Sequence, residues 1–94
     1  SAENSGEGFF SKGWIFNADM QFKIDKLLSL VHGVEAERLK GVFVTNQGFI
    51  ALNKVDSMVT QLNLNELNDS RIEVISGRID TLEGIEEELL TCLA

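Results

Sequence analysis

The sequence predicts an α+β domain, a two-layer sandwich in which a mostly antiparallel sheet of four to five strands carries two helices on one face. Short runs rich in β-branched and aromatic residues follow one another with brief turns, which favours an antiparallel meander. Two further segments carry apolar residues at helical spacing. Two amphipathic helices can both bury their apolar stripes only on the same face of the sheet. The predicted order of elements is β-α-β-β-β-β-α.

Composition limits the classes of function. A chain of 94 residues with 44% hydrophobic content suits one globular domain. The formal net charge of −7 repels phosphate backbones and anionic lipids, so neither nucleic acid nor a membrane is an expected partner. No apolar stretch approaches the roughly 20 residues of a membrane span, and the start of the chain lacks a signal-peptide pattern, so a cytoplasmic location is expected. The single cysteine, Cys92, excludes an internal disulfide and agrees with that compartment.

The first strand is expected at residues 9–16. Residues 1–8 are small, polar and rich in glycine, which predicts a disordered tail or a linker remnant, with the domain covering residues 9–94 and the natural protein continuing upstream. Within the strand, Phe10, Trp14 and Phe16 share one face by the two-residue period, and Lys12 is the exception.

The first helix is expected at residues 22–32. Asp19 is a candidate N-cap, and Gly33 is a plausible end of the helix. The apolar stripe consists of Ile24, Leu27, Leu28 and Val31.

The centre of the fold is a predicted hairpin. Residues 42–45 and 49–52 form its strands, and Asn46, Gln47 and Gly48 form the turn, where glycine can adopt a positive φ. Residues 58–64 alternate, with mostly apolar even positions, which predicts a half-buried strand. Residues 71–76 form the last strand, with Ile72 and Val74 pointing inward and Arg71 and Glu73 outward.

The second helix closes the chain. Asp80 followed three residues later by Glu83 resembles a capping box. The buried stripe is Leu82, Ile85, Leu89 and Leu93, and the exposed side is Glu83, Glu86, Glu87 and Glu88.

One motif suggests catalytic chemistry. Asn53, Lys54, Val55 and Asp56 match the pattern with which GTPases bind guanine. Three observations oppose that interpretation: a phosphate-binding loop of the G-x-x-x-x-G-K-[ST] type is absent, residues 58–64 have strand rather than helix periodicity, and 94 residues are too few for a complete GTPase domain. We therefore interpret the motif as the end of a strand and a turn, with part of a guanine-nucleotide site as the alternative.

Other candidate sites have structural explanations. His32 is expected to cap or flank a helix end, and Cys92 to pack. The successive residues Glu86, Glu87 and Glu88 point in different directions on a helix, so a solvated face is favoured over a cation site. Four serines lack a neighbouring general base: Ser29, Ser57, Ser70 and Ser76.

Taken together, the motifs resemble the C-terminal domain of the CobW family of GTP-dependent metallochaperones, over most of residues 9–93. The matching segments are Gly13-Trp14-Ile15-Phe16, Arg38-Leu39-Lys40-Gly41-Val42-Phe43-Val44-Thr45, Gly48-Phe49, Asn53, Asp69-Ser70-Arg71-Ile72-Glu73-Val74-Ile75 and Leu89-Leu90-Thr91-Cys92-Leu93.

This resemblance implies a non-catalytic accessory or protein-interaction domain of a GTPase that handles zinc or cobalt, in metal delivery or in cobalamin-related metal handling. Its implied partners are the N-terminal GTPase domain of the same protein and a client protein that receives the metal. No catalytic, cofactor-binding or metal-binding residue transfers to this chain, and no cofactor is expected. The matching positions are expected to be structural, with Gly41 allowing close backbone approach and Arg71 and Glu73 exposed.

The residues also suggest where a partner binds. Apolar residues that break the alternation, namely Phe9, Phe43, Val59 and Ile75, indicate that the outward side of the sheet docks a protein surface. A free-standing adaptor that dimerises through an open sheet edge is a further alternative.

Overall fold

The computed structural model describes the backbone of residues 2–6 and 8–94 and the side chains from residue 8 onward. The predicted α+β class and the predicted order of elements are confirmed, with one additional strand at the start. In chain order the elements are β1 (Ala2–Gly6), β2 (Phe9–Asn17), α1 (Ile24–Gly33), β3 (Arg38–Thr45), β4 (Gly48–Val55), β5 (Met58–Leu64), β6 (Asp69–Ser76), α2 (Ile79–Glu83) and α3 (Ile85–Thr91).

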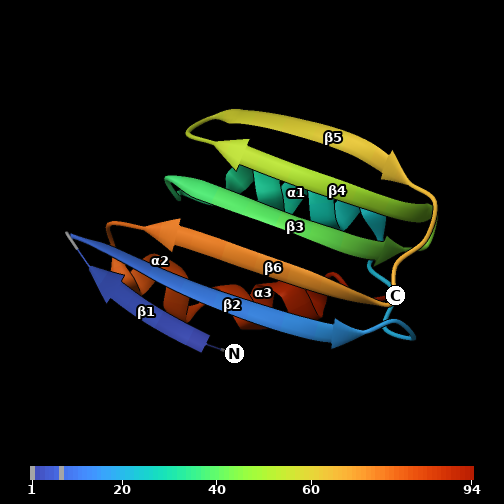
Figure 1. Cartoon of the computed structure of the whole chain (residues 1–94), viewed down its shortest axis with the longest axis horizontal. Helices are drawn as coiled ribbons and strands as arrows, with labels where there is room; N and C mark the ends of the chain where they lie inside the picture. The colour runs from blue at the N-terminus through green and yellow to red at the C-terminus, as the bar shows by residue number, and fades with distance from the viewer. Residues whose placement is uncertain (1, 7) are drawn as a thin grey trace.

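All the strands belong to one antiparallel sheet with the order β1-β2-β6-β3-β4-β5 (Figure 1). The predicted meander holds for β3, β4 and β5. The chain then returns across the sheet, so that β6 lies between β2 and β3. The returning strand provides hydrogen-bond partners for the backbone groups along one edge of β2 and one edge of β3, because β6 pairs with β2 on one side and with β3 on the other.

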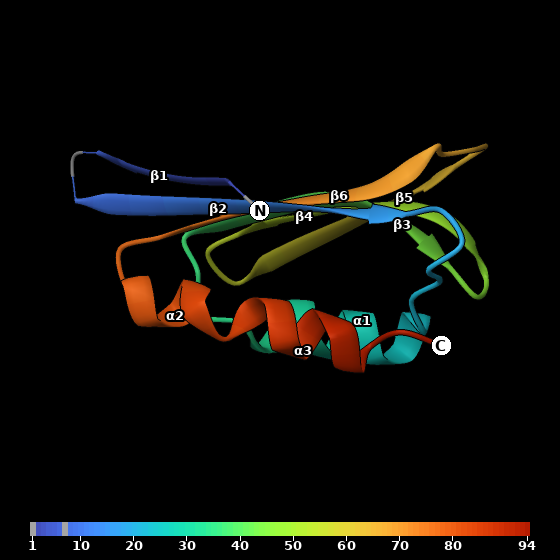
Figure 2. The same ribbon diagram turned by 90° about the horizontal axis from the view of Figure 1, so that it is seen from below.

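The helices of the described residues all lie on one face of the sheet, as predicted (Figure 2). Between the layers, the ring of Phe22 makes edge-to-face contacts with Phe16 and Phe43, at centroid distances of 5.4 and 5.6 Å. The core comprises Trp14, Phe16, Phe22, Leu27, Val31, Leu39, Phe43, Ile50, Leu52, Ile72, Val74, Leu82, Ile85, Leu89 and Cys92.

The turn of the central hairpin also organises α1. Gly48 has φ +115°, a conformation that glycine adopts without strain. Asn46 in the same turn accepts a hydrogen bond at its Oδ1 from the backbone N–H of Ile24 at 3.0 Å. The prediction that Asp19 caps the first helix is therefore wrong. The helix α1 begins at Ile24, and the first N–H of α1 is bound by a side chain from another element. The predicted end at Gly33 is confirmed.

The predicted capping box is also wrong. The residue before α2 is Arg78, and no side chain caps that helix. Asp80 lies inside the helix and instead pairs with the Arg78 guanidinium at 2.9 Å. The predicted final helix is interrupted at Gly84, which separates α2 from α3.

The alternation predicted for β5 is present, but its orientation is reversed. Gln61 lies opposite Leu52 of β4, which is buried, so the odd positions of β5 face the helices. Val59 packs against the core, whereas Met58 and Leu62 lie on the other face and are largely exposed. An alternating pattern shows that the two faces of a strand differ, but not which face meets the helices.

The structure also differs from the expected disordered tail. Ala2–Gly6 form β1 and pair with β2, while Ser1 and Glu7 lie outside the described residues. An edge strand is ordered by backbone hydrogen bonds, which composition does not encode. In the described part of the chain, no helix is long and apolar enough to span a membrane.

Candidate interaction surface

The fold separates the polar side chains of the motif that resembles a guanine-binding site. Lys54 points into the protein and is 4% exposed, and its Nζ donates hydrogen bonds to the carbonyl oxygens of Val31, His32 and Val34 at 2.8, 3.1 and 2.6 Å. The ammonium group thus binds free carbonyl groups at the C-terminal end of α1, where the helix dipole favours a positive charge. Asn53 lies on the opposite face of β4, and Asp56 occupies the following turn with φ +53°. The three side chains therefore do not converge on one ligand.

The other single candidates have structural roles. The thiol of Cys92 is 3% exposed and donates a hydrogen bond to the Glu88 carbonyl oxygen, and burial raises its pKa. His32 is exposed in the last turn of α1. Glu86 accepts a hydrogen bond from Trp14 Nε1 at 2.8 Å, which ties α3 to β2. Among residues 8–94, no three His, Cys, Asp or Glu side chains form a group that could hold a metal ion.

Two of the serines support the backbone. Ser70 is fully buried and its Oγ accepts a hydrogen bond from the N–H of Val44 at 2.9 Å. The Oγ of Ser76 accepts one from the N–H of Arg78 at 3.1 Å. The first contact joins β6 to β3, and the second stabilises the segment between β6 and α2.

The side of the sheet without helices is the candidate site, and we call it the open face. It consists of the outward side chains of β2, β6, β3, β4 and β5. A shallow hollow of about 680 Å³ lies in its middle. The residues lining the hollow are Gly13, Trp14, Ile15, Lys40, Gly41, Val42, Ala51, Leu52, Asn53, Arg71, Ile72 and Glu73.

The hollow exists because small residues face outward in the centre of the sheet. Gly13 has no side chain, and Ala51 and Val42 are short and lie opposite each other across β3 and β4. Gly41 beside them has a different role. A Cβ there would lie 2.8 Å from the Arg71 carbonyl oxygen and 2.8 Å from the Phe43 ring, so the predicted close approach at this position is confirmed.

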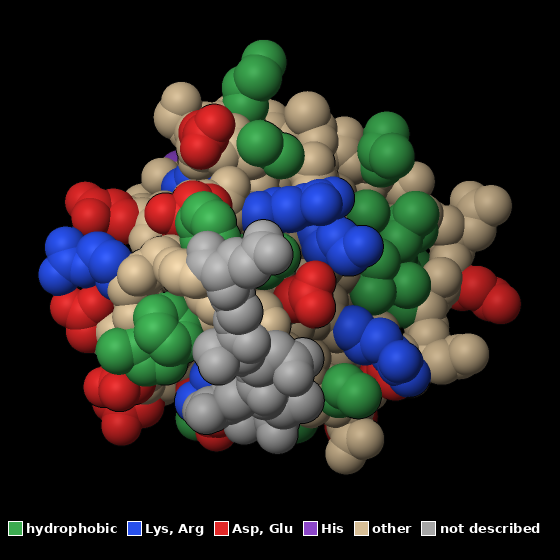
Figure 3. Space-filling view, turned by 60° about the vertical axis from the view of Figure 1, so that its left-hand side comes forward, with side chains coloured by type: hydrophobic (Ala, Val, Ile, Leu, Met, Phe, Trp, Pro, Cys, Tyr) green, Lys and Arg blue, Asp and Glu red, His purple; other side chains and the backbone are tan. Residues whose placement is uncertain are grey.

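Charged side chains surround the hollow. The Arg71 guanidinium binds both carboxylate oxygens of Asp69, at 2.9 and 3.1 Å, and these hydrogen bonds lower the pKa of Asp69. Lys40 of β3 lies opposite Glu73 of β6, and Arg38, two residues before Lys40, lies on the same face of β3. As predicted, Arg71 and Glu73 are exposed. Figure 3, an oblique view, shows lysine and arginine side chains beside hydrophobic ones.

The exposed apolar residues agree only in part with those predicted, because Phe9 and Ile75 occupy outward positions of β2 and β6 whereas Phe43 and Val59 do not. Phe43 belongs to the core and Val59 faces the helices, because both occupy inward positions of their strands. Phe9 is 47% exposed. The most exposed apolar side chains of the open face are Ile15, Met58 and Leu62, with exposures of 65, 74 and 69%. The alternation of β2 and β5 could have identified them, had the inward face of β5 been assigned correctly.

Comparison with known proteins decides the family. No protein-family model matches the chain. The zinc chaperone YeiR of Escherichia coli is 33% identical over 88 residues, which are 93% of this chain and 27% of YeiR. The resemblance is confirmed: the chain is a C-terminal domain of the CobW family.

Solved structures show the same fold. The Zn(II)-bound YjiA GTPase of E. coli superimposes with a TM-score of 0.73 at 12% identity, over 92% of this CobW C-terminal domain and 30% of YjiA. A Zn(II)-bound triple mutant of YjiA gives a TM-score of 0.74 with the same coverage. The CobW C-terminal domain thus spans less than a third of the length of these relatives.

Proposed function

We propose that this domain is a non-catalytic accessory module of a CobW-like GTPase that handles a metal in the cytoplasm, and that its open face docks the GTPase portion of the same protein. The observation that carries the docking proposal is the open face itself. It is the side of the sheet opposite the helices, with a small-residue hollow that the 65% exposed Ile15 helps to line.

The choice of occupant follows from the relatives. YeiR is described as a zinc chaperone and YjiA as a GTPase, and in each more than two thirds of the chain lies outside the matched segment. Tethered to this domain, that remainder would be present at high effective concentration, so a modest surface suffices for docking. The described residues of this domain bring no metal-binding group together, so the proposal assigns metal and nucleotide binding to the remainder.

The proposed cargo is zinc, after the descriptions of YeiR and YjiA, with cobalt or cobalamin-related handling as the alternative. A client protein that receives the metal is also part of the proposal. Metal analysis of the purified full-length protein, together with competition between Zn²⁺ and Co²⁺, checks the cargo separately from the docking.

The docking is tested by producing this domain and the GTPase portion of the same protein as separate chains. Arg71→Glu and Ile15→Asp are expected to weaken their co-purification and to reduce the affinity measured by calorimetry about tenfold or more. Lys26→Glu is the matched control, because it makes a comparable charge change at an exposed site on α1. Unchanged affinity in both open-face variants, or equal loss in the control, would contradict docking through the open face.

The guanine-nucleotide alternative is tested on the 94-residue chain alone. Because Lys54 is buried under α1 and Asn53 points to the other face, calorimetric titration with GDP is expected to give no binding. Micromolar GDP binding that Asn53→Ala abolishes would restore that alternative.

A further inference from the structure

The free edge of β5 is a second surface, separate from the hollow. β5 pairs with β4 on one side and is the outermost strand on the other (Figure 1). In an antiparallel strand, about half of the backbone N–H and C=O groups point away from the paired neighbour. On β5 these groups face away from the sheet and can bind another strand.

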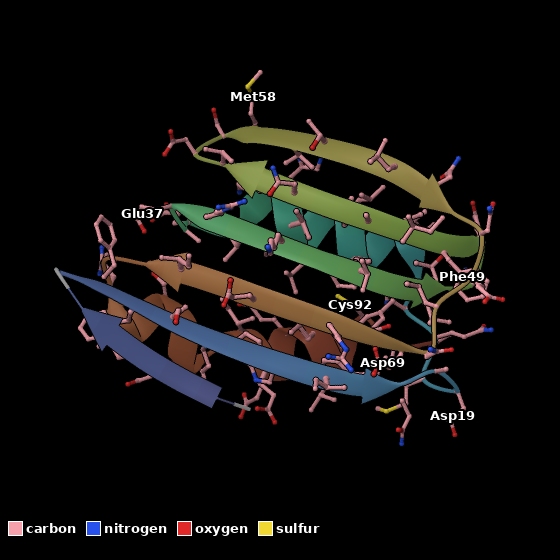
Figure 4. All side chains as sticks on the ribbon, in the orientation of Figure 1. Asp19, Glu37, Phe49, Met58, Asp69 and Cys92 are labelled. Atoms are coloured by element: carbon pink, nitrogen blue, oxygen red, sulfur yellow. The ribbon has the colours of Figure 1, made fainter. Side chains whose placement is uncertain are left out.

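Edge strands often carry charged residues or proline, which oppose such pairing, and the sequence of β5 contains neither. Its sequence, MVTQLNL, contains no charge, no proline and no glycine. Met58 and Leu62 are 74 and 69% exposed, and Met58 extends away from the sheet (Figure 4). At the opposite edge of the sheet the outermost strand is β1, which is only five residues long and whose sequence, AENSG, contains an acidic residue and a glycine.

The sequence of β5 favours a second copy of this chain over other strands, because it is complementary to itself. In a two-fold antiparallel pair centred on Gln61, Met58 lies opposite Leu64 of the second copy, and Thr60 lies opposite its Leu62. Both kinds of pair fall on the open face and are apolar or neutral. We propose that two copies associate by antiparallel pairing of their β5 strands, which joins two six-stranded sheets into one.

The charges at the ends of β5 oppose this association and make it weak. In the same register, Asp56 comes near Glu66 of the second copy at each end of the paired strands. Each chain also carries a net charge of −7. The dimer is therefore expected to strengthen as salt screens these repulsions, in contrast to an association based on opposite charges.

The test compares two lysine substitutions in the 94-residue chain by sedimentation velocity over a concentration series. Leu62→Lys places a charge in the centre of the proposed pairing and is expected to weaken dimerisation about tenfold or more. Ile15→Lys makes the same charge change on the same face, at similar exposure, but on β2. Its dimerisation is expected to stay within about twofold of the wild type. Both lysines reduce the net negative charge, so a loss confined to Leu62→Lys is a local effect.

Two further measurements make the outcome independent of any folding defect and of the docking proposal. Hydrogen exchange in β5 of the wild type is expected to slow as concentration rises, with β2 unchanged. Asp56→Asn with Glu66→Gln is expected to strengthen the dimer, and asparagine tolerates the positive φ at position 56. A wild-type chain that stays monomeric throughout, or a dimer lost in Ile15→Lys but kept in Leu62→Lys, would overturn the proposal. The first result leaves docking to the GTPase portion untouched.

Discussion

At the scale of single residues, Lys54 shows how this fold uses a buried charge. Its ammonium group lies at the end of α1, where backbone carbonyls have no partners within the helix and the helix dipole favours a cation. Three carbonyl oxygens within 3.1 Å replace the water that the ammonium loses. Lys54 therefore links β4 to the loop that leaves α1.

Replacing Lys54 by methionine keeps the length of the side chain but removes the donor. We expect Lys54→Met to lower the free energy of unfolding by about 2–3 kcal/mol, measured by urea denaturation, because the carbonyls lose a charged donor. Asn53→Ala on the other face of β4 is the control and is expected to cost less than about 1 kcal/mol. Equal effects in the two variants would contradict this role of Lys54.

Two glycines of the hollow provide a second matched pair. A Cβ at Gly41 would overlap the Phe43 ring and the Arg71 carbonyl at 2.8 Å, whereas at Gly13 the nearest atom, the Ile72 carbonyl oxygen, lies at 3.3 Å. We expect Gly41→Ala to destabilise the domain by about 1–3 kcal/mol and Gly13→Ala by clearly less. Thermal unfolding of both variants checks this, and a larger loss at Gly13 would contradict the packing described.

The thiol of Cys92 is expected to make the stability of the fold depend on pH. Burial raises its pKa in the folded state, so on raising the pH the unfolded chain loses this proton first. The stabilising contribution of the buried, neutral Cys92 thiol is thus complete below the thiol pKa of the unfolded chain. It is lost as the pH rises through the thiol pKa of the folded chain. We expect stability to fall in this alkaline range, and to fall less in Cys92→Ala. Identical pH profiles of unfolding for the two proteins would show that Cys92 is not responsible.

At the scale of elements, the sequence predicted most strands and helices, but not how their ends and faces are fixed. Periodicity located α1 and β5 because a regular pattern is local. The cap of α1 was missed because Asn46 is 22 residues from Ile24, and only the folded hairpin brings them together. The inward face of β5 was missed because its register on β4 decides it. The sequence predicted docking on the outward side of the sheet, but Met58 and Leu62 were missed as part of that surface for the same reason.

The distant cap can be tested against the local one. Asn46→Ala removes the acceptor of the Ile24 N–H and is expected to cost about 0.5–2 kcal/mol of stability. Asp19→Ala is expected to have almost no effect, because Asp19 is exposed and does not cap α1. Denaturant unfolding of both variants measures the difference, and a greater loss for Asp19→Ala would restore the local cap.

At the scale of the whole molecule, charge is divided between the two layers. The helices carry six acidic residues and one lysine, whereas the outward positions of β3 and β6 carry three basic and two acidic residues. The open face is therefore the less acidic side of a strongly acidic domain. This division is consistent with a docking surface on the open face and a solvated helical layer.

The acidic helical layer predicts how the domain responds to salt. Exposed carboxylates on neighbouring short helices repel one another, and added NaCl shortens the range of that repulsion, from about 10 Å at 0.1 M to about 3 Å at 1 M. We therefore expect the melting temperature at neutral pH to rise with NaCl. The variant with Glu83→Gln and Glu87→Gln, both exposed, should show a higher melting temperature at low salt and a smaller rise. Calorimetry at low protein concentration, where dimerisation through β5 contributes least, isolates this effect. A melting temperature that falls with NaCl would show instead that attractive pairs, such as Arg71 with Asp69, dominate the electrostatics of the fold.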